Sequence, residues 1–355
     1  MKIKFAFLTI ILLAFTACSS KSDPVQHDTE FFAMDTFVKF TAYGDNAKIA
    51  LELAEQRFYE LESLWSVTDK NSDIYAINHA NGNTTIVSTT TADLISYALQ
   101  LSQETKTLEP TIYPILTAWG FTTGENRVPS KEEIQEFLQN VGREKVTVDG
   151  NSVRLEPGAR LDLGAIGKGA AGDEAVRILK ENGVDSALLD IGGNIQLIGN
   201  KNGKDWRLGI KNPFGEGTAG VLEISDAAVV TSGNYERFFT DENGTVYGHI
   251  IDPSTGYPAD SGLASATIIA SEGKYADALS TAIFIMGLEK AAEFRRKNHD
   301  FEMILISQDG EIFITEGLRD RFTPNSAYNR GVHIIAYQVR SKVSISRQIS
   351  QNESE

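Results

Sequence analysis

Two kinds of residue are scarce in this chain: cysteine and, relative to the acidic residues, the basic ones. Cys18 is the only cysteine among 355 residues, so the chain cannot form an internal disulfide. Lys and Arg total 33 against 48 Asp and Glu, which gives a net charge of −15. Because nucleic-acid binding generally needs a basic face, this balance argues against nucleic acid as a partner.

The chain also lacks several local signatures of known chemistry. It has no serine-nucleophile elbow, no His/Cys spacing typical of zinc, no helix with paired glutamates and no Gly-x4-Gly-Lys-Ser/Thr loop. Its apolar content of 41% and charged content of 23% are ordinary for a globular protein. No common hydrolase, zinc or P-loop class is therefore indicated.

Long hydrophobic runs are missing except at the start. Residues 5–15 are almost unbroken apolar and follow Lys2 and Lys4, but this run is too short to span a bilayer comfortably. Residues 16–19, Thr-Ala-Cys-Ser, resemble a bacterial lipobox, in which the cysteine is lipidated and becomes the mature N-terminus. The alternative is an ordinary signal peptide cleaved near Ala17. We expect a lipoprotein signal peptide over 1–18, ending at lipidated Cys18, and a tether over 19–29. Such a protein is exported and anchored to a bacterial membrane on its extracytoplasmic side.

The remaining chain reads as one domain over residues 30–320, followed by a poorly ordered tail over 321–355. Helices and strands are mixed without regular alternation, which favours an α+β fold over a doubly wound sheet. Apolar spacing predicts helices over 47–65, 91–105, 130–141, 168–182, 274–288 and 289–297. Strands are predicted over 31–43, 186–199, 206–210 and 220–231, with hairpins over 145–155 and 303–315.

A glycine-rich segment over 161–169 is the first candidate site. Three glycines let the backbone bend between a strand and a helix, and the helix N-terminus and Lys168 both suit a phosphate. The alternative is a tight turn with a solvated lysine. Paired glycines at 192 and 193 indicate a bulge, a close backbone approach or a packing requirement.

Two further segments carry candidate catalytic groups. Asp277 is the only carboxylate on an otherwise apolar helix, and Thr281 lies one turn later on the same face. Two such oxygens suit Mg²⁺, although Asp277 also fits a helix start favoured by the helix dipole. His249 ends a strand beside the turn Asp-Pro-Ser-Thr-Gly at 252–256, where it presents a general base or plays a structural role.

Taken together, these segments resemble the ApbE family of FAD:protein FMN transferases. The resemblance covers about residues 30–318. It runs in order through 33–36, 110–121, 161–169, 190–194, 206–210, 231–237, 249–256 and 277–281. The family often has Gly where Asp35 stands and Asp where Glu109 stands.

The resemblance implies a fold of two α/β subdomains with a ligand cleft between them. It implies that FAD is the substrate and Mg²⁺ the cofactor. The Mg²⁺ ligands would be the Ala165 carbonyl, Asp277 and Thr281. The FAD site would be formed by Met34, Thr107, Leu108, Glu109, Asp162, Lys168 and Ile251.

The expected reaction transfers FMN from FAD to a Thr or Ser hydroxyl of an extracytoplasmic acceptor flavoprotein, such as a membrane redox-pump subunit. AMP is released, and His249 is the expected general base because its ordinary pKa suits neutral pH. Two alternatives stay open: a Mg²⁺-dependent FAD pyrophosphatase that gives FMN and AMP, and a flavin-binding lipoprotein without catalysis.

Overall fold

The computed structural model describes residues 24–328 and 330–337. The predicted signal segment with Cys18, and the end of the predicted tail, therefore lie outside the described residues. Within the described ranges, no helix combines the length and apolar character needed to cross a membrane.

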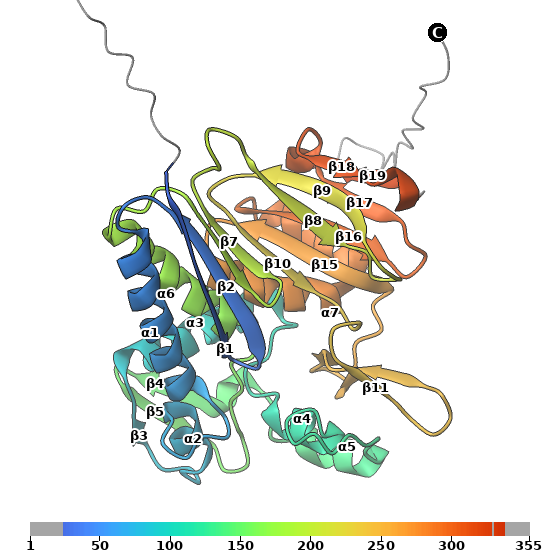
Figure 1. Cartoon of the computed structure of the whole chain (residues 1–355). Coiled ribbons are helices and arrows are strands. Elements are labelled where there is room, and N and C mark those ends of the chain that lie inside the picture. Colours follow the sequence, from blue (N-terminus) through green and yellow to red (C-terminus); the bar gives the residue numbers. More distant parts are fainter. Residues whose placement is uncertain (1–23, 329, 338–355) are drawn as a thin grey trace, which may run out of the picture.

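A nine-stranded sheet forms the centre of the protein, in the order β1-β2-β6-β7-β10-β15-β16-β17-β19 (Figure 1). Its strands are Gln26–Ala33, Thr36–Tyr43, Ala187–Ile191, Asn194–Ile198, Ala228–Ser232, Leu263–Ala270, Phe301–Ser307, Ile312–Thr315 and Val332–Ile335, in that order. Neighbouring strands are antiparallel, except that β17 and β19 are parallel. Antiparallel pairing is what the irregular alternation of elements predicts.

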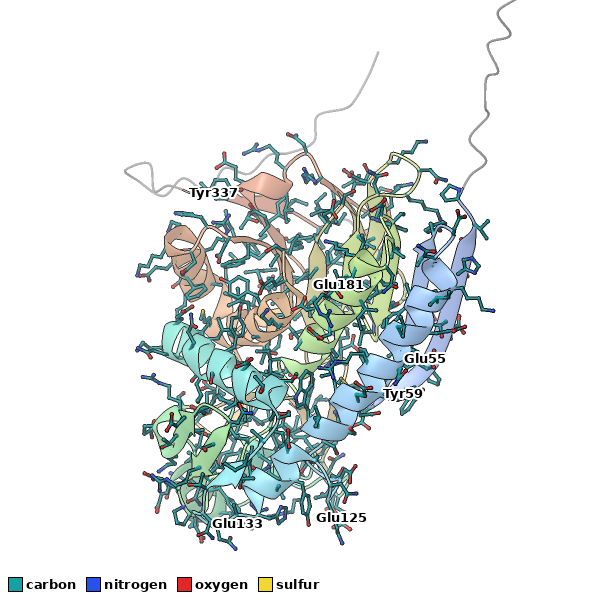
Figure 2. All side chains as sticks on the ribbon, turned by 90° about the vertical axis from the view of Figure 1, so that its left-hand side faces the viewer. Glu55, Tyr59, Glu125, Glu133, Glu181 and Tyr337 are labelled. Carbon is teal, nitrogen blue, oxygen red and sulfur yellow. The ribbon has the colours of Figure 1, made fainter. Side chains whose placement is uncertain are left out.

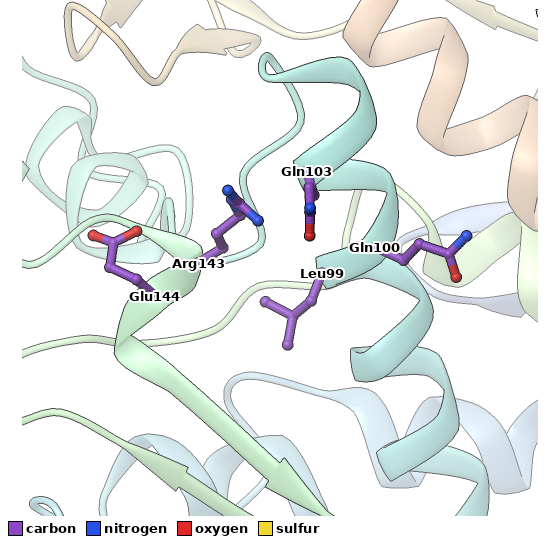
Figure 3. Close-up of a pocket in the computed structure, with 5 residues that line it drawn as sticks. All are labelled: Leu99, Gln100, Gln103, Arg143 and Glu144. Carbon is purple, nitrogen blue, oxygen red and sulfur yellow. The ribbon is translucent and has the colours of Figure 1, made fainter.

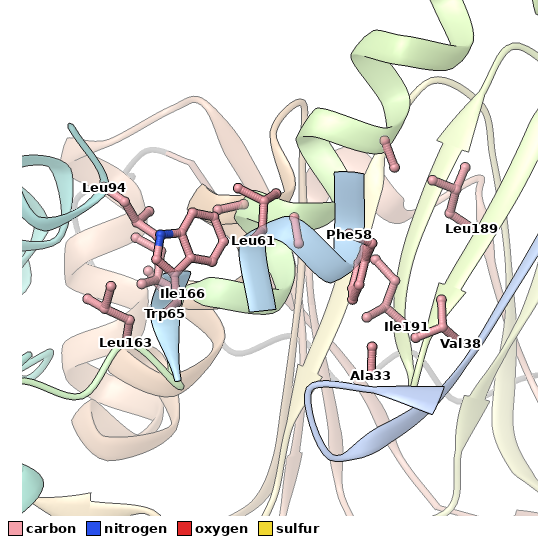
Figure 4. Packing of buried hydrophobic residues seen from close by; sticks show 14 of the residues in the cluster. Ala33, Val38, Phe58, Leu61, Trp65, Leu94, Leu163, Ile166, Leu189 and Ile191 are labelled. Carbon is pink, nitrogen blue, oxygen red and sulfur yellow. The ribbon is translucent and has the colours of Figure 1, made fainter. Parts of the chain in front are cut away.

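Three long helices cover one face of this sheet. They are α1 (Ala47–Trp65), α6 (Gly167–Glu181) and α7 (Gly273–Lys297). Helix α1 buries residues at three- and four-residue spacing, among them Phe58, Leu61 and Trp65. Phe58 lies toward Val38 and Leu189 of the sheet, whereas Trp65 lies beside Leu163 and Ile166 (Figure 4). The outward face of α1 carries Glu55 and Tyr59, as the side view shows (Figure 2).

A smaller sheet covers part of the opposite face. It has the order β18-β9-β8, and its strands are Phe322–Pro324, Thr218–Ile224 and Trp206–Lys211. Leu208 and Leu222 from this sheet share one apolar cluster with Ile304 and Ile314 of the large sheet. The large sheet is thus packed between a helical layer and a second sheet.

A second region lies beyond one end of the large sheet (Figure 1). It contains α2 (Asp73–Asn78), α3 (Thr89–Thr105), α4 (Tyr113–Trp119), α5 (Lys131–Leu138), η1 (Arg143–Lys145) and the sheet β3-β5-β4, with strands Thr85–Ile86, Ser152–Leu155 and Val146–Asp149. A satellite cluster of Ile115, Trp119, Ile134 and Ile251 joins α4 and α5 to β13 (Ile251–Asp252). The other short elements are β11 (Phe238–Thr240), β12 (Val246–Gly248), β14 (Tyr257–Pro258), η2 (Glu316–Leu318) and η3 (Ser326–Tyr328).

Several predicted elements need correction. The single strands predicted over 31–43 and 186–199 are hairpins, β1–β2 and β6–β7, and the strand predicted over 220–231 is divided between β9 and β10. The division into two helices predicted over 274–288 and 289–297 is confirmed, because Gly287, with a non-helical φ of 74°, interrupts α7 at a kink.

The predicted domain boundaries were too narrow at both ends. Strand β1 begins at Gln26, inside the segment predicted as a tether over 19–29. Strands β18 and β19 lie within residues 321–355, the predicted tail, and pair with β9 and β17. Sheet pairing therefore orders residues that carry little pattern of their own.

Candidate functional site

The site is built where the start of α6 meets the first turn of α7. The Gly169 N–H, one of the free donors at the N-terminus of α6, donates to Asp277 Oδ2 at 2.8 Å. Asp277 is 5% exposed. Two segments about a hundred residues apart in sequence, the predicted glycine loop and the predicted metal helix, are thereby joined.

Only glycine fits at this junction. A side chain at Gly169 would overlap the Gly273 carbonyl oxygen and come within 2.7 Å of Asp277 Cβ. Gln196 of β7 fills the remaining space, and its Nε2 donates to the Gly169 carbonyl at 2.9 Å. Gly169 is therefore required for helix packing, a role that neither reading of this segment, a phosphate-type loop or a tight turn, included.

Asp173 supplies a second link between the two helices. From α6 it accepts the N–H groups of Gly273 and Lys274, at 2.5 and 2.9 Å, and so caps the N-terminus of α7. Burial raises the pKa of Asp173 to about 6, against the lowering effect of these two hydrogen bonds. No sequence pattern pointed to this residue, because its partner helix begins a hundred positions later.

The cost of burying the Asp277 carboxylate is only partly offset by its neighbours. Burial raises the pKa of this carboxyl, while nearby Lys168, the Gly169 N–H and a weaker polar contact from Asn194 act in the opposite direction. Thr281 lies one turn further along α7, and its hydroxyl lies 3.3 Å from the Ser232 Oγ. A buried carboxylate with so few hydrogen bonds favours a cation as its missing partner.

Lys168 lies close enough to three candidate groups to act on each. Its charge lowers the pKa of Asp162, Asp277 and His249. Burial has the larger effect on each group: it raises the pKa of the two carboxyls and lowers that of the imidazole. Asp162 is half-buried, its Oδ1 accepts the Gly164 N–H at 2.6 Å, and burial raises its pKa. The structure thus brings three predicted site residues, Asp162, Asp277 and His249, within electrostatic range of a fourth, Lys168.

His249 follows strand β12, and its tautomer is defined by its contact. Nδ1 lies 3.0 Å from the Arg237 carbonyl oxygen. Since a carbonyl only accepts, Nδ1 carries the proton and Nε2 is left with a free lone pair. Burial, together with the positive charges of Arg237 and Lys168, lowers the pKa of His249 to about 4, against the raising effect of its hydrogen bond to the Arg237 carbonyl. The imidazole is therefore neutral and able to accept a proton at neutral pH.

Met34 and Asp35 form the two-residue turn between β1 and β2. Their φ angles of 51° and 58° are both left-handed, as a tight hairpin requires but as few residues other than glycine adopt. The Met34 N–H donates to Glu62 Oε1 at 2.5 Å. The adjacent Thr36 contacts Gly192, where a side chain would overlap its hydroxyl. This hairpin therefore lies beside the β6–β7 turn.

The other predicted FAD residues contact protein groups. Thr107 Oγ1 donates to the Ala282 carbonyl of α7 at 3.0 Å, and Leu108 is buried in the core. Glu109 accepts the hydroxyl and N–H of Thr111 at 2.6 and 3.0 Å. Burial raises its pKa. Ile251 is buried with Trp119 in the satellite cluster.

The residues fit a divalent cation held by few protein ligands. The Ile166 carbonyl accepts the first bond of α6, from the Ala170 N–H, so the carbonyl of Ala165 precedes the helical ladder. Asp277 and Thr281 would supply the other two oxygens. Among the described residues, no group of three or more His, Asp or Glu has the arrangement of a metal site. The donor set suits Mg²⁺, which keeps several waters or phosphate oxygens of its own.

Two hollows lie outside this cluster. One, of about 280 Å³, adjoins the cluster at Arg237 and is bordered also by Phe121, Gly124, Asn126, Glu236 and Phe238. The other, of about 300 Å³, lies between α3 and η1, where Leu99 and Gln103 face Arg143 (Figure 3). None of the predicted site residues lines either hollow.

Comparisons with known proteins agree on one family. Residues 34–305 match the ApbE family. The FAD:protein FMN transferase of Klebsiella pneumoniae (strain 342) is 33% identical over 270 residues, which cover 74% of this chain and 84% of that protein. The FAD:protein FMN transferase of Treponema pallidum (strain Nichols) is 30% identical over 343 residues, or 90% and 94% of the two chains.

Solved structures show the same similarity. The ApbE protein of Thermotoga maritima superposes with a TM-score of 0.79 at 33% identity, covering 84% of this chain and 99% of that one. The flavin transferase ApbE of Vibrio cholerae gives a TM-score of 0.75 at 27% identity, with 84% and 99% covered. The predicted resemblance and fold class are confirmed.

Proposed function

This chain belongs to the ApbE family, and on that premise we propose that it is a FAD:protein FMN transferase that modifies a Thr or Ser side chain of an acceptor protein. The hydroxyl oxygen attacks the phosphorus of the FMN half of FAD. The P–O bond to the AMP half breaks, AMP leaves, and the hydroxyl proton passes to a base. The observation that carries this proposal is the Gly169–Asp277 contact, which joins a phosphate-type loop to a buried carboxylate.

The cation site is proposed at the Ala165 carbonyl, Asp277 and Thr281. When bound, Mg²⁺ would neutralise charge on the pyrophosphate as the P–O bond breaks. Asp277 is buried and has one short hydrogen bond, from Gly169, so it keeps an oxygen for this role.

The chain's own residues supply the other functions. Lys168 and the N-terminus of α6 hold the pyrophosphate oxygens and stabilise the charge that develops on them. Met34, Thr107, Leu108, Glu109, Asp162 and Ile251 are proposed to bind FAD. His249 is proposed as the general base, because its Nε2 is unprotonated at neutral pH and its Nδ1–H is fixed by Arg237.

The acceptor is proposed to be an extracytoplasmic flavoprotein, such as a subunit of a membrane redox pump. We also propose that Cys18 carries a lipid, which would hold the enzyme on the same side of a bacterial membrane. Labelling of cells with an alkyne fatty acid tests this. Wild-type protein should be labelled and sediment with membranes, whereas a Cys18→Ser variant that is still labelled would contradict the proposal.

The function is tested by incubating the enzyme with FAD, Mg²⁺ and a candidate acceptor protein, then weighing the acceptor by mass spectrometry. An added FMN mass, lost with EDTA and with Asp277→Ala but retained with Asp149→Asn, supports the transferase. Asp149 is a matched control, since it is a carboxylate on the exposed β4–β5 hairpin. Release of FMN and AMP without labelling, across several acceptors, would instead identify a FAD pyrophosphatase. Tight FAD binding with neither product would identify a flavin-binding lipoprotein.

A further inference from the structure

Asn194 is a buried amide whose side chain has no hydrogen-bond partner among the described residues. It is 2% exposed, and neither its Nδ2 nor its Oδ1 is paired. An amide can donate two hydrogen bonds and accept two, so burial without partners is unfavourable for the protein alone. A group retained in this state points to a partner that arrives from outside the chain.

The fold directs Asn194 toward Asp277. Asn194 begins β7, where it pairs with Ile191 of β6 and Val230 of β10. Residues two apart on a strand share a face, and the next residue on this face is Gln196, which donates to the Gly169 carbonyl. Strand β7 also packs against both α6, which carries Gly169, and α7, which carries Asp277. Asn194 therefore lies at the Gly169–Asp277 junction.

Gln196 shows what a structural amide looks like in the same place. It is 3% exposed, fills the space between Gly172 and Gly273, and uses its Nε2 in a 2.9 Å hydrogen bond. Asn194 is equally buried but makes no such bond. Gln196, which makes a hydrogen bond to the backbone, therefore has a packing role, whereas the unpaired Asn194 amide is available to a ligand.

We infer that Asn194 is a positioning residue of the cation site. With a cation bound, the Asn194 amide oxygen would accept a hydrogen bond from a water on that cation, and the amide N–H groups would then donate to the Asp277 carboxylate and orient it toward the cation. This inference rests on the cation site of the proposed function, and it assigns a role in that site to a residue outside the predicted ligand set. Partners of this kind fix the orientation of a metal ligand without touching the metal.

The test measures cation binding directly. EDTA-treated full-length protein is titrated with Mn²⁺, and free Mn²⁺ is followed by its electron paramagnetic resonance signal. The variants are Asn194→Val and Asn194→Thr, which have nearly the same shape and differ by one hydroxyl. We expect Asn194→Val to weaken Mn²⁺ binding by about 10- to 100-fold, the usual effect of losing such a contact. Asn194→Thr should retain most of the affinity.

Ser265→Ala is the matched control, because Ser265 is 1% exposed and its hydroxyl is also unpaired. It should leave the Mn²⁺ affinity unchanged. The inference is overturned if Asn194→Val and Asn194→Thr bind Mn²⁺ equally, or if both only lower the unfolding temperature of the cation-free protein. Should Asn194→Val not fold, Asn194→Ala, which removes the same amide without adding bulk, takes its place: an unchanged Mn²⁺ affinity overturns the inference, and a loss of at least about 10-fold supports it.

Failure of the inference and failure of the proposed function are distinguishable. If Asn194→Val weakens Mn²⁺ binding but the wild-type enzyme never labels an acceptor, the cation-site role stands and the transferase proposal falls. If the wild-type enzyme labels an acceptor and Mn²⁺ binding is unchanged in both variants, only the role of Asn194 falls.

Discussion

Gly169 and Asp277 meet across a 2.8 Å hydrogen bond, in which the backbone N–H at the start of α6 donates to a carboxylate on α7. The same glycine accepts from Gln196 through its carbonyl. One residue therefore joins α6, α7 and the central sheet. The position of the carboxylate therefore depends on the packing of both helices.

Gly169→Ala should destabilise the protein and displace Asp277. The added methyl group would overlap the Gly273 carbonyl oxygen, which belongs to the backbone and cannot easily move away. Overpacking of this kind costs about 1–3 kcal/mol. Urea denaturation measures it. Gly215→Ala is the control, since its nearest neighbour would be Asn212 Nδ2 at 3.8 Å. Equal stability of the two variants would contradict the packing argument.

Asp277→Asn should separate stability from activity. Burial raises the pKa of Asp277 above its usual value, so the native state binds more protons than the unfolded state in the window above pH 3.8. Stability from this group therefore falls as pH rises through the folded pKa. Removing the charge should leave the cation-free protein as stable or more stable at pH 7. Flavin transfer should fall by about 100-fold, and Mg²⁺ should no longer raise the unfolding temperature. A Mg²⁺-dependent rise that persists would refute the ligand role.

His249 should make the transfer tolerant of acid. Its pKa is lowered from 6.5 to about 4, chiefly by burial, so the base stays neutral well below pH 6.5. We expect kcat/KM for the acceptor to stay level from pH 8 to about 5.5 and to decline toward pH 4. His249→Gln should lower kcat by about 10²- to 10⁴-fold. An acid limb centred near pH 6.5 in the wild-type enzyme would show that the pKa of His249 is not lowered, and a pH profile and kcat unchanged in His249→Gln would show that this imidazole is not the base.

Lys168→Gln should shift that acid limb upward. The lysine charge opposes protonation of His249, so its removal raises the pKa of the imidazole, and activity is lost at a higher pH than in the wild type. FAD affinity should fall as well, by about tenfold, because one charge-assisted contact to the pyrophosphate is lost. Lys180→Gln, at the other end of α6, is the control. Identical pH profiles for the two variants would argue against this coupling.

The sequence predicted the helices better than the strands. Apolar spacing and the Ser130–Glu133 capping box located α1, α3 and α5 because these signals are local. The β1–β2 hairpin was missed because its turn uses Met34 and Asp35, which carry no turn signal. The division of α7 into two helices was predicted close to its true place, the kink at the non-helical Gly287.

The candidate site was also predictable only where its signals are local. The order of the motifs predicted which segments form the candidate site, because glycine, lysine and a lone carboxylate are recognisable within a few residues of sequence. The partners of those groups come from distant strands and helices. Asp173 caps a helix a hundred residues away, Arg237 fixes the tautomer of His249, and Asn194 lies beside Asp277 across the layers. Such contacts depend on tertiary packing and leave no local pattern.

Strand β1 runs from Gln26, where the described chain begins its first element, to the Met34–Asp35 turn beside the site (Figure 1). Its eight residues span about 26 Å. Residues 19–25 can extend at most about 25 Å further. For an enzyme anchored at Cys18 as proposed, the strand and residues 19–25 together limit the height of the Met34–Asp35 turn above the membrane to about 50 Å. An acceptor hydroxyl carried higher than that above the bilayer would be out of range, however well its sequence matched.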